Sequence, residues 1–385
     1  MRIVMLDPLL ATIPYDKALV GALVEAGHDV LVCGRQLRKG ELWDESHGAY
    51  LELPLALPNP PSTASGMRLR AYWWSYQIKY LRALFFALRS SREFRPDIIH
   101  TQWMLVPLLD SIVLKMTGNK IGKILTMHDT EVANGGAVQG AQVFGLERVL
   151  RLFDRIIVHT DVATDRLVKR GIEPGKITRI PHGILTVDST TSTGEPPRRD
   201  KLTFMLFGML KHYKGVDVLI KAVQAMNRSA RDRCRFVVAG KAAMDVEQLI
   251  SMSKRCGVFH LFEFRIGFIP DDEFDNVLKS ADVFVYPYRE IEASGALMLS
   301  LPYGKPIIAS NIGLFSEMLV SGVHGRLVEP EDAQGLSEAL EFLANDKDFR
   351  AQAGHHVKQL ADGIPSWTEI ADKTAREYRK VARRY

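Results

Sequence analysis

A short segment rich in glycine and lysine follows an apolar run in the second half of the chain. It reads Phe207-Gly208-Met209-Leu210-Lys211-His212-Tyr213-Lys214-Gly215 and opens a stretch of helical period from Val216 to Met226. Glycine lets a backbone approach an anion, a helix N-terminus offers free N–H groups, and Lys211 and Lys214 add positive charge. The segment suits a diphosphate; a turn with two solvated lysines is the alternative.

A second candidate loop runs from Arg289 to Ala296 and leads into another helical stretch. It ends in Ser294-Gly295-Ala296, small residues whose amides could hold an anion, and Ser294 could equally cap the helix. Glu290 and Glu292 lie beside them and could accept hydrogen bonds from sugar or ribose hydroxyls. Solvated loop carboxylates are the alternative reading of these glutamates.

In the first half, a strand-like run ends in Thr126-Met127-His128-Asp129-Thr130. A histidine at a strand end is expected to face a cleft, where it could bond a sugar hydroxyl or balance negative charge. Helix capping by Asp129, with His128 as a bystander, is the alternative. His100 and His182 end similar runs, and structural roles suit them at least as well.

Aromatic and basic residues alternate in the helical stretch from Met67 to Ser91. The aromatic ones are Trp73, Trp74, Tyr76, Tyr80, Phe85 and Phe86. Such a helix could rest on an anionic membrane, with aromatic rings at headgroup level and Lys and Arg on phosphates. Core packing explains many of these aromatics equally well.

Short apolar runs alternate with helical stretches along the chain, which predicts βαβ units and parallel sheets in an α/β fold. The expected strands are 2–6, 29–33, 97–100, 123–127, 155–158, 202–207, 235–239, 261–264, 283–286 and 306–309. Further helices are expected at 15–26 and 161–170. In such sheets ligands bind beyond the carboxyl ends of strands, where the loops above lie.

The polar segment from Asp188 to Asp200 is too poor in apolar residues to form core and is the expected linker. It separates two Rossmann-like domains, residues 1–187 and 200–365. A final helix, 366–385, could pack on either one. At 385 residues the chain is long enough for two such domains.

The net charge of +5 is too small to argue for nucleic acid. No apolar run is long enough for a membrane span, and the start of the chain does not resemble a signal peptide, so a cytoplasmic protein is expected. Cys33, Cys234 and Cys256 are odd in number and widely spaced, which indicates buried thiols rather than disulfides or a metal site.

Together these segments resemble the GT-B glycosyltransferases, most closely the retaining family 4, the glycosyl transferases group 1. The resemblance is strongest from Leu202 to Leu340. Its landmarks are the two loops above, Tyr303-Gly304-Lys305-Pro306-Ile307-Ile308-Ala309-Ser310 and Gly325-Arg326-Leu327-Val328-Glu329-Pro330-Glu331-Asp332.

The resemblance implies that the C-terminal domain binds a nucleoside-diphosphate sugar and that the N-terminal domain takes a glycan or lipid-linked acceptor. Lys214 matches the family lysine on the diphosphate, and His128 the histidine that reaches the transferred sugar. With Glu292 they are the catalytic candidates. Asp7 to Asp16 takes the place of the family's glycine-rich first loop. Tyr15 and Asp16 in that loop, together with Asp129 after His128, are the candidate acceptor contacts.

Two departures from the family bear on the donor site. Met209 stands where many members carry an arginine, which leaves Lys211 as its substitute. The glutamate pair is also absent, with Ile291 and Leu299 at its positions. Glu290 or Glu292 could replace the first glutamate; nothing obvious replaces the second, which in relatives grips the ribose.

The expected reaction is a retaining, front-face transfer in which Lys211, Lys214 and the loop amides stabilise the departing diphosphate, without a metal or a cofactor. A nucleotide-sugar epimerase of the same architecture and a catalytically silent sugar-nucleotide or glycan-binding partner protein are the rivals. A dinucleotide oxidoreductase is disfavoured because no G-x-G-x-x-G follows the first strand.

Overall fold

The computed structural model of the chain describes residues 1–38, 41, 43–55, 67–130, 145–187 and 200–382. These residues form two compact units. The first holds the described residues up to 183 together with 365–382, and the second holds the described residues from 184 to 364. The expected linker lies outside the described residues, apart from Asp200.

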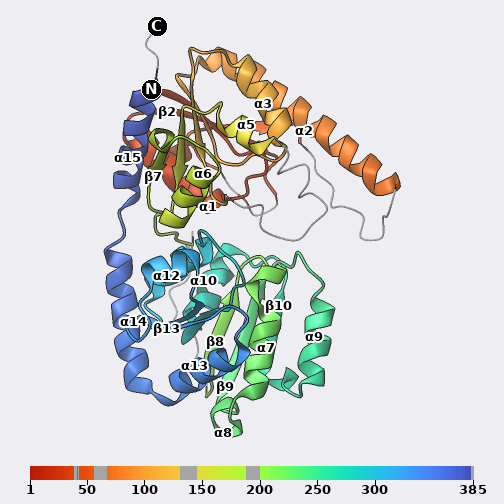
Figure 1. Ribbon diagram of the computed structural model, residues 1–385, viewed down its shortest axis with the longest axis vertical. Helices are drawn as coiled ribbons and strands as arrows, with labels where there is room; N and C mark the ends of the chain where they lie inside the picture. Colours follow the sequence, from red (N-terminus) through yellow and green to blue (C-terminus); the bar gives the residue numbers. More distant parts are fainter. Residues whose placement is uncertain (39–40, 42, 56–66, 131–144, 188–199, 383–385) are drawn as a thin grey trace. The chain divides into compact units, whose positions relative to one another are not determined.

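The first unit is built on a parallel sheet in the order β3-β2-β1-β4-β5-β6-β7 (Figure 1). Its strands are β1 (Arg2–Leu6), β2 (Asp29–Arg35), β3 (Ala49–Leu53), β4 (Ile98–Thr101), β5 (Gly122–Thr126), β6 (Arg155–Val158) and β7 (Ile177–Arg179). Its helices are α1 (Ile13–Glu25), α2 (Met67–Phe94), α3 (Pro107–Met116), α5 (Leu146–Leu150), α6 (Asp161–Lys169) and α15 (Trp367–Val381).

The second unit is built on a parallel sheet in the order β10-β9-β8-β11-β12-β13. Its strands are β8 (Leu202–Phe207), β9 (Cys234–Gly240), β10 (Phe262–Ile266), β11 (Val283–Tyr286), β12 (Ile307–Ser310) and β13 (Gly325–Val328). Its helices are α7 (Val216–Ala225), α8 (Arg228–Arg231), α9 (Val246–Arg255), α10 (Asp271–Lys279), α11 (Gly295–Ser300), α12 (Gly313–Met318), α13 (Ala333–Asn345) and α14 (Lys347–Asp362).

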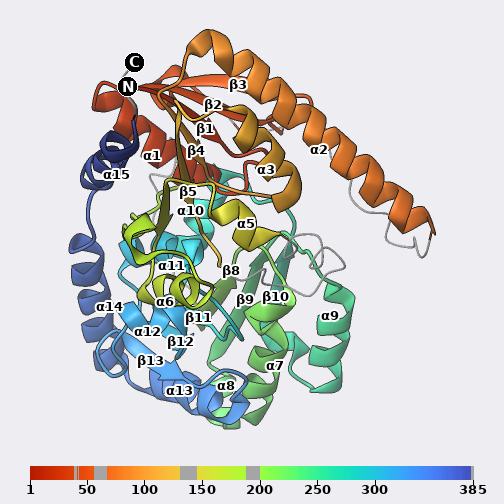
Figure 2. The ribbon, with the colours of Figure 1, turned by 45° about the horizontal axis from the view of Figure 1, so that its top comes forward.

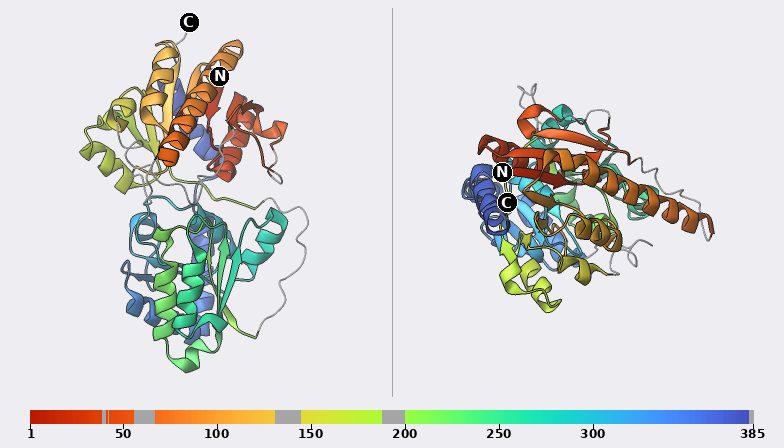
Figure 3. Two further views of the ribbon diagram at one scale, coloured as in Figure 1. Left: turned by 90° about the vertical axis from the view of Figure 1, so that its right-hand side faces the viewer. Right: turned by 90° about the horizontal axis from the view of Figure 1, so that it is seen from above.

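Helices cover both faces of each sheet (Figure 3), which confirms the predicted fold of two Rossmann-like α/β domains. The sequence prediction missed strands β3, β7 and β13. All three lie at sheet edges, and several of their residues are partly exposed. An edge strand pairs on one side only, so its residues need not form the continuous apolar run by which the central strands were found.

The final helix, α15, belongs to the first unit and packs along α1 (Figure 1). Ser366 and Glu369 form a capping box at its start, a motif that pairs two otherwise free backbone N–H groups. Gly183 leaves room for it, since a β-carbon there would lie 2.6 Å from the indole of Trp367. The end of the chain therefore completes the core of the first unit.

In each sheet the strand order reverses once, between β1 and β4 in the first unit and between β8 and β11 in the second. Successive connections leave in opposite directions at such a point, so a crevice opens beyond the carboxyl ends of the two strands. The loops after β8 and β11 are those that the sequence selected for the donor. This places the lysine-containing segment and Arg289–Ala296 at one sheet edge.

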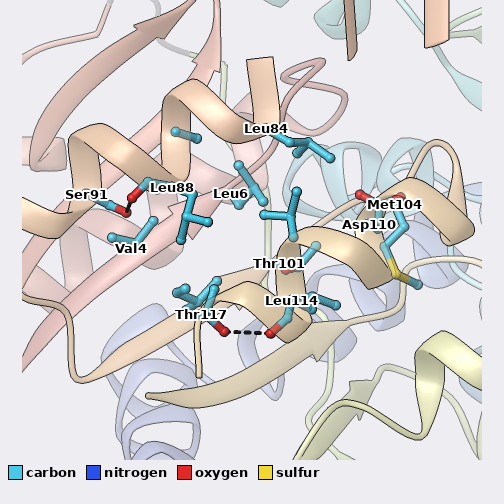
Figure 4. Close-up of a pocket in the computed structure, with 13 residues that line it drawn as sticks. Val4, Leu6, Leu84, Leu88, Ser91, Thr101, Met104, Asp110, Leu114 and Thr117 are labelled. Atoms are coloured by element: carbon cyan, nitrogen blue, oxygen red, sulfur yellow. Dashed lines mark hydrogen bonds between the residues drawn. The ribbon is translucent and has the colours of Figure 1, made fainter. Parts of the chain in front are cut away.

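A small apolar cavity of about 30 Å³ lies between α2 and α3 above β1 and β4 (Figure 4). Leu84, Leu88 and Val113 are among the residues that line it. Asp110 also reaches it, where its Oδ1 accepts a 2.5 Å hydrogen bond from Tyr80 and burial raises its pKa to about 7. The apolar walls suit no diphosphate, so this cavity is not the candidate donor site.

Within the described residues, no helix combines the length and apolar character that a bilayer crossing requires. The same residues include no group of three or more His, Cys, Asp or Glu side chains placed to hold a metal ion. Cys33 and Cys234 are buried, as expected, whereas Cys256, at the C-terminal end of α9, is only half-buried, which corrects the expectation.

Candidate functional site

Close backbone contacts shape the loop between β8 and α7. Gly208 has a φ of 106°, and its carbonyl oxygen would lie 2.1 Å from a β-carbon at Gly240. Gly215 has a φ of 66°, and a β-carbon there would lie 1.9 Å from the carbonyl oxygen of Pro287. Glycine at 215 is thus required twice, by the left-handed backbone and by the approach of the loop after β11.

Lys214 is buried under this loop, with 4% of its surface exposed. Its Nζ donates to the carbonyl oxygen of Phe207 at 3.3 Å and to the hydroxyl of Tyr288. The ammonium also lies 4.5 Å from the centre of the Tyr288 ring, at a distance that suits a cation–π contact. Its partners in the described structure are neutral, so the positive charge is not compensated by a carboxylate.

Burial, assisted by the nearby charge of Lys211, lowers the pKa of Lys214 to about 7. A buried ammonium without a counter-ion is costly, and an arriving anion would relieve that cost. The lysine is therefore placed to gain from a phosphate more than an exposed lysine would. The charge of this site therefore fits an anion.

Arg289 joins three loops at the same sheet edge. Its guanidinium forms paired hydrogen bonds with Asp217 in the first turn of α7, at 3.0 and 2.7 Å. It also bonds Glu331 at 3.0 Å and the carbonyl oxygen of His212 at 2.8 Å. Two parallel bonds fix orientation as well as distance, so this residue sets the position of the lysine loop.

Sequence reasoning missed Tyr288, Arg289 and Asp217 as site residues. The signal that could have found two of them is the segment Pro287-Tyr288-Arg289 directly after β11, since residues at that end of a strand face the ligand edge. Asp217 gave no comparable signal, because an acidic residue in a first helical turn is common for electrostatic reasons alone.

The residues of the second loop differ in exposure. Glu290 is exposed, whereas Glu292 is buried with 4% of its surface exposed. The Ser294 hydroxyl accepts a hydrogen bond from the Leu297 amide at 3.1 Å, so the capping role is present. Gly295 is exposed and Ala296 half-buried at the start of α11. That these five residues, Glu290, Glu292, Ser294, Gly295 and Ala296, bind the donor stays a prediction.

The two departures from the family also have defined places. Met209 is exposed on the loop after Gly208, and Lys211 is half-buried at the start of the turn that holds Lys214. Leu299 is half-buried in α11, and the half-buried Ile291 precedes Glu292. Lys211 thus lies in the same loop as Met209. This is required if Lys211 supplies the positive charge that an arginine at position 209 provides in many family members.

In the first unit, His128 lies at the end of β5 in a cluster of rings. It stacks on Trp103 with centroids 5.2 Å apart and meets the ring of Tyr15 edge-on at 4.8 Å. His159 and His182, which follow β6 and β7, extend the cluster, with successive centroids 5.2 Å apart. Three neighbouring strands therefore bring their histidines to one sheet edge.

The imidazoles of this cluster are neutral at pH 7. Burial lowers the pKa of His159 to about 4 and that of His182 to about 3, and burial with these neighbours holds the pKa of His128 well below its usual range. His128 Nε2 lies 3.0 Å from Oε1 of Gln102 and must donate to it, which leaves Nδ1 as an acceptor. Of the two roles considered for His128, the neutral ring suits hydroxyl binding and not charge balance.

His100 and His182 have structural contacts. His100 bonds the Tyr378 hydroxyl of α15 at 2.6 Å and the Thr126 hydroxyl at 2.7 Å. His182 Nδ1 bonds the carbonyl oxygen of Gly183 at 2.7 Å. His100 in particular ties the last helix to the centre of the sheet.

The candidate acceptor contacts at the start of α1 are buried. Asp16 is completely enclosed and Tyr15 is 2% exposed, and their role in acceptor binding stays a prediction. The Asp7 carboxylate accepts hydrogen bonds from the backbone amides of this loop, at 2.7 Å from Ala11 and 3.2 Å from Leu9. Asp129 is half-buried, and residues 131–144 after it lie outside the described structure.

Family models match both halves of the chain. Residues 14–183 match the glycosyl transferase 4-like domain, and residues 190–360 match glycosyl transferases group 1. Glycogen synthase of Mycobacterium tuberculosis is 26% identical over 93% of this chain and 88% of its own length. D-inositol 3-phosphate glycosyltransferase of Corynebacterium diphtheriae is 26% identical over 75% of this chain and 71% of its own length.

Solved structures agree on the fold. HepE of Anabaena, in complex with UDP-glucose, aligns with a TM-score of 0.76 at 14% identity and covers 99% of this chain and 100% of its own. Sucrose-phosphate synthase of Thermosynechococcus elongatus aligns with a TM-score of 0.74 at 18% identity, covering 99% of each chain.

Proposed function

Because the chain belongs to the GT-B glycosyltransferases of group 1, we propose that it moves a sugar from a nucleoside-diphosphate sugar to a glycan or lipid-linked acceptor in polysaccharide or glycoconjugate synthesis. The main support for a nucleoside-diphosphate sugar as donor is the buried ammonium of Lys214, which has no carboxylate partner. It lies at the sheet edge where the connections after β8 and β11 leave in opposite directions. The UDP-glucose of HepE, a protein of the same fold, supports this class of donor.

In the proposed reaction the second unit stabilises the leaving diphosphate. Lys214 binds a phosphate oxygen, Lys211 adds a second charge from the same loop, and the amides near Gly208 and Ser294–Ala296 donate hydrogen bonds. These groups are fixed before the reaction, so little reorganisation opposes the departure of the phosphate. Because the cations belong to the protein, the proposed reaction needs no metal, and no cofactor takes part.

The proposed stereochemical course is retention. The acceptor hydroxyl attacks on the face from which the diphosphate leaves, and a phosphate oxygen takes its proton. The neutral His128 bonds a hydroxyl of the transferred sugar, and Glu292 and Glu290 are the candidate carboxylates beside the donor. NMR of the product tests this course, since retention preserves the anomeric configuration of the donor sugar and inversion would contradict the proposal.

Calorimetric titration with UDP and with GDP, without metal, tests the donor half. We expect one of them to bind, and Lys214→Met to weaken binding by roughly 10–100-fold because it removes a charge-assisted bond from a buried site. Methionine keeps the side chain's length in the buried site. Lys221→Met, at an exposed position of α7, is the matched control and should bind as the native chain does.

Product analysis tests the reaction itself. Incubation with the nucleotide sugar that binds should release the nucleoside diphosphate slowly through hydrolysis, and faster when a glycan or lipid-linked acceptor is added. Conversion of the donor into an isomer would favour the epimerase. Tight binding with neither hydrolysis nor transfer would favour the silent partner protein, which the leucine at 299 keeps in consideration.

The proposal places the protein in the cytoplasm, with an acceptor presented there or at the cytoplasmic face of a membrane. The alternation of aromatic and basic residues in α2 supports the membrane alternative. Fractionation of cells into soluble and membrane pellets tests the location. Recovery of the protein outside the cytoplasm would contradict it.

A further inference from the structure

One side of α2 exposes an apolar stripe. Trp74, Ile78 and Phe85 are spaced by four and seven residues, which places them on one side of a helix, and all are exposed, Trp74 by 68%. The opposite side of α2, with Tyr80, Leu84 and their neighbours, packs in the core. A helix with its apolar requirement already met in the core has no structural need for a second apolar stripe.

The neighbouring helix α3 repeats the pattern. Leu108, Ile112 and Met116 follow one another at intervals of four, and all three are exposed, Ile112 by 44%. The helices lie side by side in the same unit (Figure 2), and Leu109 and Val113 of α3 join the same apolar cluster as the buried side of α2. Because the buried sides of the two helices share one cluster, both stripes lie on the solvent side of the same helix pair, which we call the α2–α3 surface.

Basic residues accompany the apolar ones on this surface. The exposed cations are Lys79, Arg82, Arg89 and Arg92 on α2 and Lys115 on α3. None of them has an ion-pair partner in the part of the chain that the structure describes. The exposed acidic residue of the described part of α2 is Glu93. The surface thus combines apolar side chains with uncompensated positive charge.

We propose that the α2–α3 surface docks on an anionic phospholipid bilayer. Trp74 and the aliphatic stripe enter the headgroup region, where burial of their apolar area is favourable, and the lysines and arginines lie at lipid phosphates. The charge complementarity selects this occupant, since a second copy of the chain would bring like charges together. Docking of this surface would bring the enzyme to a lipid-linked acceptor, and in this one point it rests on the proposed function.

Flotation of the full chain with vesicles tests the surface directly. We expect binding to vesicles of equal parts phosphatidylcholine and phosphatidylglycerol, and little binding to phosphatidylcholine alone or at high salt. Trp74→Ser with Ile78→Ser, and Ile112→Ser with Met116→Ser, should each lower the partition coefficient by roughly tenfold. Phe268→Ser, which changes an apolar residue that is 64% exposed in the second unit, should leave it unchanged.

Three outcomes would overturn the inference: no binding to either vesicle, equal binding to both, or equal loss in the Phe268 variant. A concentration-dependent dimer that the α2 and α3 substitutions abolish would assign the surface to self-association instead. Calorimetry of the same variants with the nucleotide keeps the two proposals apart. Vesicle binding without nucleotide binding leaves the surface standing and the donor site refuted; the reverse result refutes the surface alone.

Discussion

Arg289 and Asp217 form a paired ion bridge, with Nη1–Oδ1 at 3.0 Å and Nη2–Oδ2 at 2.7 Å, between the loop after β11 and the first turn of α7. Partial burial disfavours the charged carboxylate, but the bonds from Arg289 outweigh it and lower the pKa of Asp217. The lysine loop connects β8 to α7, and the bridge joins the α7 end of that loop to the loop after β11. Its position therefore depends on a contact between residues 72 apart in the sequence.

A double-mutant cycle on this bridge should show coupling. Arg289→Ala and Asp217→Ala should each lower the free energy of unfolding, and the double variant should lose less than their sum by about 1 kcal/mol. Chemical denaturation measures each value. The same cycle on Arg228 and Asp232, an exposed pair at the start and the C-cap of α8, should give a coupling near zero; strict additivity at both pairs would contradict the prediction.

The close approach at Gly215 predicts a large effect for one added methyl group. Gly215→Ala must adopt a φ of 66° and also displace the carbonyl of Pro287. Gly257 has a nearly equal φ of 69° with nothing within 4 Å of its β-position, so Gly257→Ala isolates the conformational cost of about 1 kcal/mol. We expect Gly215→Ala to cost roughly 1–3 kcal/mol more, measured by thermal unfolding; equal losses would mean that the loop yields easily.

Nucleotide affinity should depend on pH through Lys214. The free protein has a lysine pKa of about 7, and a bound diphosphate favours the charged form and raises that pKa. Binding above pH 7 therefore takes up a proton, and affinity should fall as pH rises from 7, by up to about tenfold per unit. Titrations in buffers of different ionisation enthalpy measure the uptake.

Lys214→Met supplies the control for this pH dependence. The variant has no titrating group at this position, so its weaker affinity should change little between pH 7 and 9. The same slope in the variant and the native chain would assign the proton to another group.

The buried carboxyl pair Asp7 and Asp16 should respond oppositely to the same substitution. Burial, with the charge of Asp7, raises the pKa of Asp16 well above 3.8, so the folded protein retains a proton there that the unfolded chain releases. The contribution of this carboxyl to the free energy of unfolding therefore falls as pH rises above about 4. Asp16→Asn should raise stability at pH 7 and flatten that slope, because a neutral amide can donate to Asp7 without carrying a charge.

Asp7→Asn should destabilise the fold by about 1–3 kcal/mol, because the amides of Leu9 and Ala11 lose a charged acceptor. Denaturation of both variants at pH 5 and pH 7 checks the pair of signs. Stabilisation by Asp7→Asn, or loss of stability at pH 7 on Asp16→Asn, would place the proton on the other carboxyl.

Several candidate site residues could be proposed from the sequence because their signals are local. The segment from Gly208 to Gly215 shows both its glycines and its lysines within one loop, and His128 follows an apolar strand directly. The burial of Tyr15 and Asp16 could not be predicted from the sequence, because it depends on what packs over a residue. Here Trp367 covers Tyr15, with ring centroids 5.1 Å apart, from the far end of the chain.

By itself the sequence determined the α/β class, the central strands and the loops that leave them, because the period of apolar residues and the placement of glycine act over a few residues. Only the tertiary structure decided that Arg289 holds Asp217, that Tyr288 contacts Lys214, and that α15 belongs to the first unit. These contacts join segments that are far apart in the chain, and nothing in the sequence of one segment predicts its contact with the other. Packing of the sheets and helices brings them together, and burial then decides which charges are compensated and which are left to bind a ligand.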